Sequence, residues 1–269
     1  MGWITARRRH PAAGYAVVLL GLLVVAAVYS AITGGGGNAS AASPAGGPAA
    51  QINAGRQLFL QDCATCHGLE AQGTVNGPSL IGVGAAAVDF QVSTGRMPAK
   101  EPGAEMPRKP LELASAQDHA VAAYVASLAG GPTIPTPEQV NSSSADLALG
   151  QSLFTADCAQ CHNFDGAGGA LTYGKYAPAL TSSTPTQIYE AMLTGPEAMP
   201  VFNDTTITPT EKRDIIGYVT QARAQANPGG FSLGRVGPVT EGLVAFLGLL
   251  FFMVAAAMWI TAKHGKAHE

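Results

Sequence analysis

All four cysteines of the chain lie in two short motifs of the form Cys-x-x-Cys-His. The reactive positions are Cys63, Cys66 and His67 in the first motif, and Cys158, Cys161 and His162 in the second. This spacing is the attachment signal for c-type haem. Two thiols can form thioether bonds with the vinyl groups on one edge of a porphyrin, and the histidine that follows can ligate the iron. The sequence therefore predicts two covalently bound haems c, with His67 and His162 as axial iron ligands.

Two other chemistries use the same cysteine spacing. A Cys-x-x-Cys pair can form a redox dithiol or half of a zinc site. A dithiol would not need a histidine directly after both pairs. A zinc site built from all four cysteines would leave His67 and His162 unexplained. Haem attachment is therefore the favoured interpretation.

A second axial ligand for each iron must come from elsewhere in the chain. We predict Met97 and Met199, because each precedes a proline and follows a Thr-Gly pair by a short loop. Met106 also precedes a proline and is an alternative to Met97, but it lies farther from that pair, in a segment at 100–109 that we expect to be a charged surface insertion. His119 falls in a predicted helix and is not expected to bind iron. A His/Met pair raises the reduction potential and leaves no open position for a substrate, so electron transfer is favoured over catalysis at the iron.

The motifs belong to two copies of one longer pattern. An offset of 95 residues places Cys63 on Cys158. The same offset pairs the residues before the motifs, which are Gly55 with Gly150, Leu58 with Leu153, Phe59 with Phe154 and Asp62 with Asp157. Two domains of one fold are therefore expected.

The pattern of apolar residues predicts an all-α chain. Short helices at 54–61 and 147–156 lead into the cysteines, and longer helices cover 116–128 and 209–224, with Ser115 and Thr208 as N-caps. Loops rich in glycine and proline fill the remainder, and no alternating strand pattern is evident. The expected organisation is an N-terminal transmembrane helix or signal-anchor at 1–33, a flexible linker at 34–52, domain 1 at 53–130, a linker at 131–146, domain 2 at 147–227, a C-terminal transmembrane helix at 238–262 and a cytoplasmic tail at 263–269.

Two apolar runs, at 15–32 and 242–262, each reach the length of about 18 residues that spans a bilayer as a helix. A cleaved signal peptide is an alternative for the first run, since it also has a basic start and an apolar middle. The second run has no such alternative.

Positive charges predict the orientation of these spans. Residues 7–9 are all arginine, and Lys263 and Lys266 follow the second run. The positive-inside rule places both termini in the cytoplasm and residues 39–236 on the extracytoplasmic side of the cell membrane. The net charge of −3 gives no basic footprint for nucleic acid.

Each copy of the repeat resembles a class I cytochrome c domain. The resemblance rests on the haem motif, a Pro-x-Leu loop, the Met-Pro loop and a helix bearing a tyrosine. It implies that the carbonyl groups of Pro78 and Pro178 accept hydrogen bonds from His67 and His162. It also implies that the first and last helices of each domain cross, at Gly55 with Tyr124 and at Gly150 with Tyr218.

The whole order of segments is similar to that of the dihaem cytochrome c subunit, or cytochrome cc, of the actinobacterial menaquinol–cytochrome c reductase (the bcc complex). The resemblance implies cytochrome b, a Rieske iron–sulfur protein and a cytochrome aa3-type oxidase as partners, with the haem at His67 receiving electrons. Such a subunit catalyses nothing alone. The alternatives are a subunit of another dehydrogenase or oxidase complex, a self-standing anchored carrier, and a dihaem peroxidase, which the two Met-Pro loops disfavour.

Overall fold

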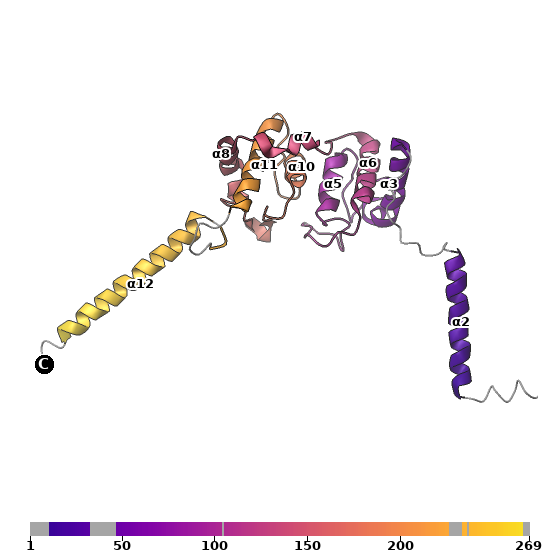
Figure 1. The fold of residues 1–269 in the computed structure, drawn as a ribbon, viewed down its shortest axis with the longest axis horizontal. Helices are drawn as coiled ribbons and strands as arrows, with labels where there is room; N and C mark the ends of the chain where they lie inside the picture. The colour runs from indigo at the N-terminus through magenta and orange to yellow at the C-terminus, as the bar shows by residue number, and fades with distance from the viewer. Residues whose placement is uncertain (1–10, 33–46, 104, 226–232, 236, 266–269) are drawn as a thin grey trace, which may run out of the picture. The chain divides into compact units, whose positions relative to one another are not determined.

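The computed structural model describes residues 11–32, 47–103, 105–225, 233–235 and 237–265. The chain divides into two units, 1–45 and 46–269 (Figure 1). The arginines at 7–9, most of the predicted spacer and the end of the predicted tail lie outside the described residues.

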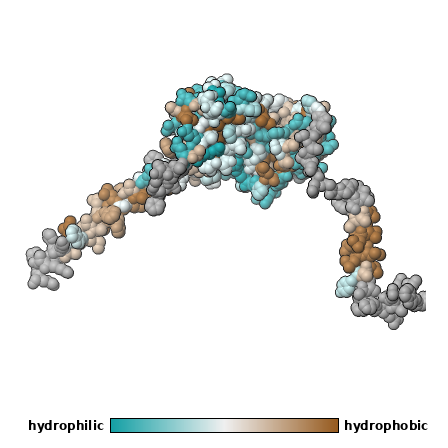
Figure 2. Space-filling model, viewed as in Figure 1, coloured by the Kyte–Doolittle hydropathy of each residue, from teal (hydrophilic) through white to brown (hydrophobic). Residues whose placement is uncertain are grey.

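The first unit contains one helix, α2 (Pro11–Ile32), within its described part. Its apolar side chains are exposed, and Figure 2 shows them as a brown band. The apolar stretch that is described, Gly14–Val28, is shorter than the roughly 20 residues of a typical span. The N-terminal helix is therefore confirmed, and its crossing of a membrane stays a prediction.

The first domain of the second unit is built on a close crossing of two helices, α3 (Pro48–Asp62) and α6 (Ser115–Ala129). A Cβ atom on Gly55 would lie 1.9 Å from the carbonyl oxygen of Ala120, so only glycine allows this approach. The ring centroids of Phe59 and Tyr124 lie 5.3 Å apart beside the crossing. The crossing expected from the resemblance is confirmed.

The second domain repeats this arrangement with α8 (Leu147–Asp157) and α11 (Pro209–Ala224). A Cβ atom on Gly150 would lie 2.1 Å from the carbonyl oxygen of Asp214, one helical turn before Tyr218. The rings of Phe154 and Tyr218 lie 5.4 Å apart. The duplication seen in the sequence is thus a duplication of the helix pair.

The helix starts were predicted with mixed success. The side chain of Thr208 accepts a hydrogen bond from the backbone of Glu211, so the predicted N-cap of α11 is confirmed. The predicted cap at Ser115 is wrong, because Ser115 is the first residue of α6 and Ala114 holds the cap position. Two helices, α5 (Gly84–Ser93) and α10 (Pro185–Thr194), were not predicted.

The chain is helix-rich but carries one small sheet in its described part. Strand β1 (Gly169–Ala170) pairs antiparallel with β2 (Tyr176–Ala177). The all-α expectation is corrected to this extent, because strands of two residues are too short to show an alternating pattern in the sequence. The other short elements are α4 (Ala64–His67), α7 (Pro137–Val140), η1 (Ser142–Ser144), α9 (Ala159–His162), η2 (Thr172–Gly174) and η3 (Leu233–Arg235).

The two domains pack against each other through the unpredicted helices. Helix α5 of the first domain contacts α10 of the second. The side-chain amide of Gln187 on α10 donates to the backbone oxygen of Ser93 at 3.1 Å and to its hydroxyl at 3.2 Å. The helix that precedes the Thr-Gly pair in each copy therefore forms the interdomain contact.

The last helix, α12 (Pro238–Gly265), contains a stretch at Val239–Ala262 that is long and apolar enough to cross a membrane. Its described apolar side chains are exposed along the helix (Figure 2). A water-soluble helix would not display such a surface, so this segment agrees with the predicted C-terminal span.

Candidate haem sites

The first haem motif lies where α3 ends and the single turn α4 begins. Cys63 is the C-cap of α3, and His67 closes α4. The Nδ1 atom of His67 lies 2.8 Å from the carbonyl oxygen of Pro78. A carbonyl oxygen only accepts, so Nδ1 carries the hydrogen and Nε2 keeps its lone pair for a metal. The predicted contact between His67 and Pro78 is present.

The second motif has the same geometry. Cys158 caps α8, and His162 closes α9 with its Nδ1 atom 3.0 Å from the carbonyl oxygen of Pro178. Burial lowers the pKa of His162, while the hydrogen bond to Pro178 opposes that shift. The imidazole is therefore held neutral, which is the form that binds a metal.

The first cysteine thiol of each motif lies in surroundings that disfavour a thiolate. Burial, with smaller effects from Asp62 and Cys66, raises the pKa of Cys63 to about 11. Burial, again with neighbouring charges, raises the pKa of Cys158 to about 12. A reactive Cys-x-x-Cys dithiol has a lowered thiol pKa. The environment of both motifs therefore differs from that of a redox dithiol.

The first motif faces a cavity in domain 1 that contains both candidate methionines. Met97 and Met106 line it together with the cysteines and His67. Met97 also packs against the apolar core of this domain. The backbone N–H of Met106 donates to the Glu197 carboxylate of domain 2 at 2.7 Å. Both methionines line the same cavity, so the choice of Met97 stays a prediction.

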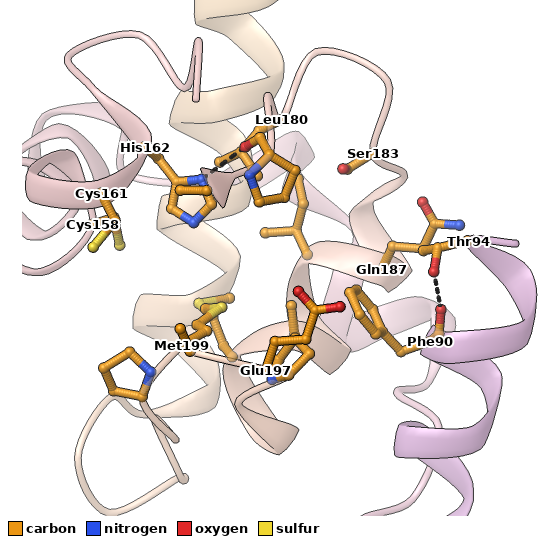
Figure 3. A pocket seen from close by; sticks show the side chains of 18 of the residues that line it. Phe90, Thr94, Cys158, Cys161, His162, Leu180, Ser183, Gln187, Glu197 and Met199 are labelled. Carbon is orange, nitrogen blue, oxygen red and sulfur yellow. Dashed lines mark hydrogen bonds between the residues drawn. The ribbon is translucent and has the colours of Figure 1, made fainter. Parts of the chain in front are cut away.

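The second motif faces a cavity in domain 2, drawn in Figure 3. His162 lies on one side of it and Met199 on another, with Cys158 and Cys161 at one end. The apolar walls include Phe154, Leu171, Leu180, Ile188, Met192, Phe202, Ile215 and Val219. A flat apolar group attached at the cysteines would have His162 and Met199 available to it.

The loop that carries Met199 turns back sharply after α10. Gly195 has a φ of 57°, and a Cβ atom there would meet Val201 and the Met199 carbonyl within 3 Å. The backbone N–H of Phe202 then donates to the carbonyl of Met192 at 2.7 Å, which returns the loop to the helix. The loop therefore presents Met199 from a fixed backbone.

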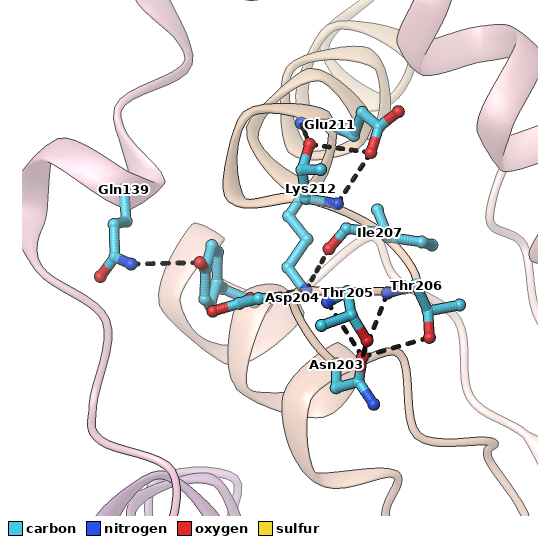
Figure 4. Close-up of polar contacts among 10 residues, drawn as sticks. Gln139, Asn203, Asp204, Thr205, Thr206, Ile207, Glu211 and Lys212 are labelled. Carbon is cyan, nitrogen blue, oxygen red and sulfur yellow. Dashed lines mark hydrogen bonds and ion pairs between the residues drawn. The ribbon is translucent and has the colours of Figure 1, made fainter.

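Lys212 of α11 ties down the far end of this loop (Figure 4). Its side chain is fully buried, and Nζ donates to the Asp204 carboxylate at 2.9 Å and to the Ile207 carbonyl at 2.6 Å. The Asn203 side chain accepts from the backbone of Thr205 at 3.0 Å within the same turn. Movement of this segment would leave the buried Lys212 ammonium without its partners, so Lys212 fixes the conformation of the segment that follows Met199.

Residues of the first domain also reach the second cavity. Its lining includes Phe90, Thr94, Arg96, Glu105 and Arg108. The segment at 100–109, which we expected to be a charged surface insertion, does expose Glu101 and Arg108, but it is not wholly solvated. The segment lies against domain 2, where the Glu105 carboxylate accepts from the backbone of Tyr176 at 3.1 Å. Sequence reasoning missed Arg96 and Arg108, because only packing between the domains brings them to this cavity.

The residues present fit a haem c in both domains. Each cavity offers two thiols on one edge, a histidine whose tautomer is set by a backbone carbonyl, a methionine and apolar walls. A bound haem supplies an iron that changes reversibly between the ferrous and ferric states. The fold and the sites define a c-type cytochrome with two tandem haem domains.

Comparison with known proteins narrows this class. The family model described as cytochrome c oxidase, cbb3-type, subunit III matches residues 50–125 and again 145–219. The cytochrome bc1 complex cytochrome c subunit of Corynebacterium diphtheriae is 44% identical over 229 residues, which cover 80% of this chain and 82% of that protein. The protein of the same name from Mycobacterium tuberculosis is 45% identical over 221 residues, with 80% and 79% covered. The chain belongs to the family of cytochrome bc1 complex cytochrome c subunits.

A more distant relative shares only one part of the chain. The cbb3-type cytochrome c oxidase subunit CcoP of Rhodobacter capsulatus is 38% identical over 100 residues, or 32% of this chain and 33% of that protein. The predicted likeness to the dihaem subunit of a quinol–cytochrome c reductase is confirmed, as is the prediction of two haems c.

Proposed function

We propose that this chain is the subunit through which electrons leave a quinol–cytochrome c reductase and reach a terminal oxidase. Electrons enter from a Rieske iron–sulfur protein at the first domain, pass to the second, and leave for a cytochrome aa3-type oxidase. Cytochrome b is the other reductase partner, and the chain catalyses nothing alone. This proposal rests on one main observation. The chain contains two equivalent haem sites, each with a histidine hydrogen-bonded to a proline carbonyl, in domains that pack through α5 and α10.

Coordination by histidine and methionine supports this role. We infer that Met97 and Met199, together with His67 and His162, would hold the irons of the two bound haems. An iron held by one histidine and one methionine would have no vacant position for peroxide. Its reduction potential would be higher than that of a haem held by two histidines. Such a site suits transfer between a high-potential iron–sulfur centre and an oxidase, and it does not suit a peroxidase.

We also infer two membrane spans that flank the haem domains. The span near the C-terminus corresponds to α12 and the other to α2, with both termini in the cytoplasm and the haem domains on the opposite side of the cell membrane. The domains that we propose, 53–130 and 147–227, overlap the two matched segments of the family model, 50–125 and 145–219, over most of their length. Anchoring at both ends would keep the carrier beside its partners, in place of a diffusing cytochrome.

Copurification tests the assignment to a reductase. An affinity tag placed after Glu269 is expected to bring down cytochrome b and a Rieske protein from detergent-solubilised membranes, together with a cytochrome aa3-type oxidase. Single-turnover reduction by quinol should then reduce both haems of the chain. A haem protein that purifies alone would contradict the proposal.

A subunit of a cbb3-type oxidase is the second candidate, favoured by the matched family model and by the likeness to CcoP. The same purification separates the two. Recovery of a cbb3-type catalytic subunit without cytochrome b would support this candidate. The extent of the match favours the reductase, since CcoP covers about a third of the chain and the bc1 relatives cover four fifths.

A further inference from the structure

Two guanidinium groups of the first domain lie in the wall of the second domain's cavity. Arg96 follows α5, directly after Gly95, and Arg108 lies near the end of the segment at 100–109. Both line the cavity that contains Cys158, Cys161 and His162. The haem site of one domain is thus partly built by the other.

Arg96 is buried, and its ion pair with Glu197 is a long one. Only 7% of the residue is exposed, and its Nε atom has no hydrogen-bond partner among the described residues. The Oε1 atom of Glu197 is 3.8 Å away, beyond hydrogen-bond distance, and this atom already accepts from the backbone of Met106. A buried cation with an unused donor is costly. We therefore expect a further hydrogen-bond acceptor beside the Arg96 guanidinium group.

Arg108 adds a second cation to the same wall. Its two Nη atoms donate to neutral oxygens, the Ser182 hydroxyl at 2.7 Å and the Gln187 side-chain amide at 3.2 Å. Burial lowers the pKa of Arg96, Glu197 opposes that shift, and the charge of Arg108 lowers it further. The two guanidinium groups repel each other across this wall, and an anion between them would relieve the repulsion.

Haem chemistry identifies that anion. The vinyl groups that form thioethers and the two propionate groups lie on opposite halves of the porphyrin. Figure 3 shows Cys158 and Cys161 at one end of the cavity, with Gln187 and Thr94 at the other. Arg108 bonds to Gln187 at that far end. A porphyrin attached at the cysteines would direct its propionates toward the first domain.

We propose that Arg96 and Arg108 of the first domain bind the propionate carboxylates of the haem held by the second domain. A guanidinium group matches a carboxylate with two parallel hydrogen bonds, and the charged pair strengthens both. The second haem site is then complete only when the two domains are packed together. The cations also favour the reduced, less positive iron, and so raise the reduction potential of this haem.

The test uses the full-length holoprotein with Arg96→Gln and Arg108→Gln, singly and together. Potentiometric titration is expected to show a lower midpoint potential for one haem and an unchanged midpoint for the other. A propionate without its guanidinium partner has a higher pKa, so the pH dependence of that midpoint should move to higher pH. Resonance Raman bands of propionate bending should shift in the same variants. Repeating the titration in a Met199→His background identifies the affected haem as the second one.

Three controls keep the proposal falsifiable. Arg56→Gln removes an exposed arginine of α3 and should leave both midpoints and the Raman bands unchanged. Arg108→Lys keeps the charge and should largely retain the midpoint. Glu197→Gln removes an anion and should raise the midpoint. Arg96 could instead act only as the ion-pair partner of Glu197. Both variants would then break the same ion pair, and Arg96→Gln and Glu197→Gln would shift the midpoint potential in the same direction. That result would overturn the proposal.

Unchanged Raman bands in both arginine variants would overturn it as well, as would a shift confined to the first haem. Arg108 is exposed, so Arg108→Gln is expected to fold even if Arg96→Gln does not. If only Arg108→Gln folds, its midpoint potential and Raman bands decide the outcome.

Discussion

Gly55 of α3 lies so close to Ala120 of α6 that a Cβ atom would stand 1.9 Å from the Ala120 carbonyl oxygen. Gly150 meets Asp214 in the second domain in the same way, at 2.1 Å. Each haem motif directly follows the helix that makes this approach. The position of the cysteines in both domains therefore depends on a glycine.

We expect Gly55→Ala and Gly150→Ala each to destabilise its own domain. Adding atoms to a filled contact costs about 1–3 kcal/mol, and more when the neighbour is backbone that cannot move aside. Denaturant unfolding of the holoprotein, followed by haem absorbance, measures the loss. Gly47→Ala is the matched control, because nothing lies within 4 Å of its added Cβ and its φ is −58°. Equal stability of Gly55→Ala and Gly47→Ala would contradict the crossing.

Substitution of the methionines tests the axial ligands. Met199→His should lower the midpoint potential of the second haem while both thioether bonds remain, because imidazole is the more basic ligand. Met97→Leu should abolish the far-red charge-transfer band of one ferric Met-ligated haem, and Met106→Leu should retain it. An unchanged midpoint in Met199→His would remove Met199 as a ligand. Loss of the band in Met106→Leu alone would assign that residue in place of Met97.

A buried group of carboxyls near the domain contact predicts a pH-dependent stability. Glu190 of α10 is fully buried, and burial, followed by the charge of Asp89, raises its pKa to about 10. Burial and Asp89 also raise the pKa of Asp118 to about 8. Asp89 itself lies 3.3 Å from the imidazole of His119.

The folded chain binds more protons here than the unfolded chain between about pH 4.5 and the raised pKa values. The stabilisation that comes from the protonated Glu190 and Asp118 carboxyls is therefore complete below the pKa of the unfolded chain, and it declines as the pH rises toward the raised pKa values. Glu190→Gln should flatten this decline, and the difference between pH 6 and pH 9 should shrink by at least about 1 kcal/mol, the value of one pKa unit. Thermal unfolding across this range measures it. An unaltered pH profile in Glu190→Gln would show that Glu190 is not the group responsible.

Lys212→Met should loosen the loop that carries Met199. The substitution leaves the buried Ile207 carbonyl without its donor, at a cost of about 1–3 kcal/mol for an unsatisfied buried acceptor, while the half-exposed Asp204 carboxylate turns to water. The second haem should also lose part of its ferric methionine signature as the loop opens. Arg56→Met removes an exposed cation from the other domain and serves as control. A full signature together with unchanged stability would show that the loop holds Met199 without Lys212.

Much of the site was predictable because its chemistry is local. Covalent haem attachment requires two thiols and a histidine at a fixed short spacing. The role of Cys63, Cys66 and His67 can therefore be recognised from the sequence without knowledge of the fold. The duplication, and the glycines Gly55 and Gly150 at the helix crossings, follow from the offset between the copies. Helix α12 was also predictable, since its exposed apolar length is a property of the chain itself.

Helix α5 escaped prediction because α6 of its own domain and α10 of the second domain both cover it. Residues of α5 that would otherwise face solvent, such as Asp89, are buried, so the helix lacks the alternation of polar and apolar faces that marks a surface helix. The cap at Ser115 was misplaced by one residue, which is the scale on which helix boundaries vary.

The sequence by itself determined the two haem attachment sites, the repeated domain and the apolar last helix, because each is written in residues that are neighbours along the chain. Only the tertiary structure decided that Arg96 and Arg108 reach the cavity of the other domain, that Glu190 is buried beside Asp89, and that both Met97 and Met106 face one site. The physical reason is that these relationships depend on the packing of surfaces distant in sequence. Spacing along the chain carries no record of which surfaces will meet.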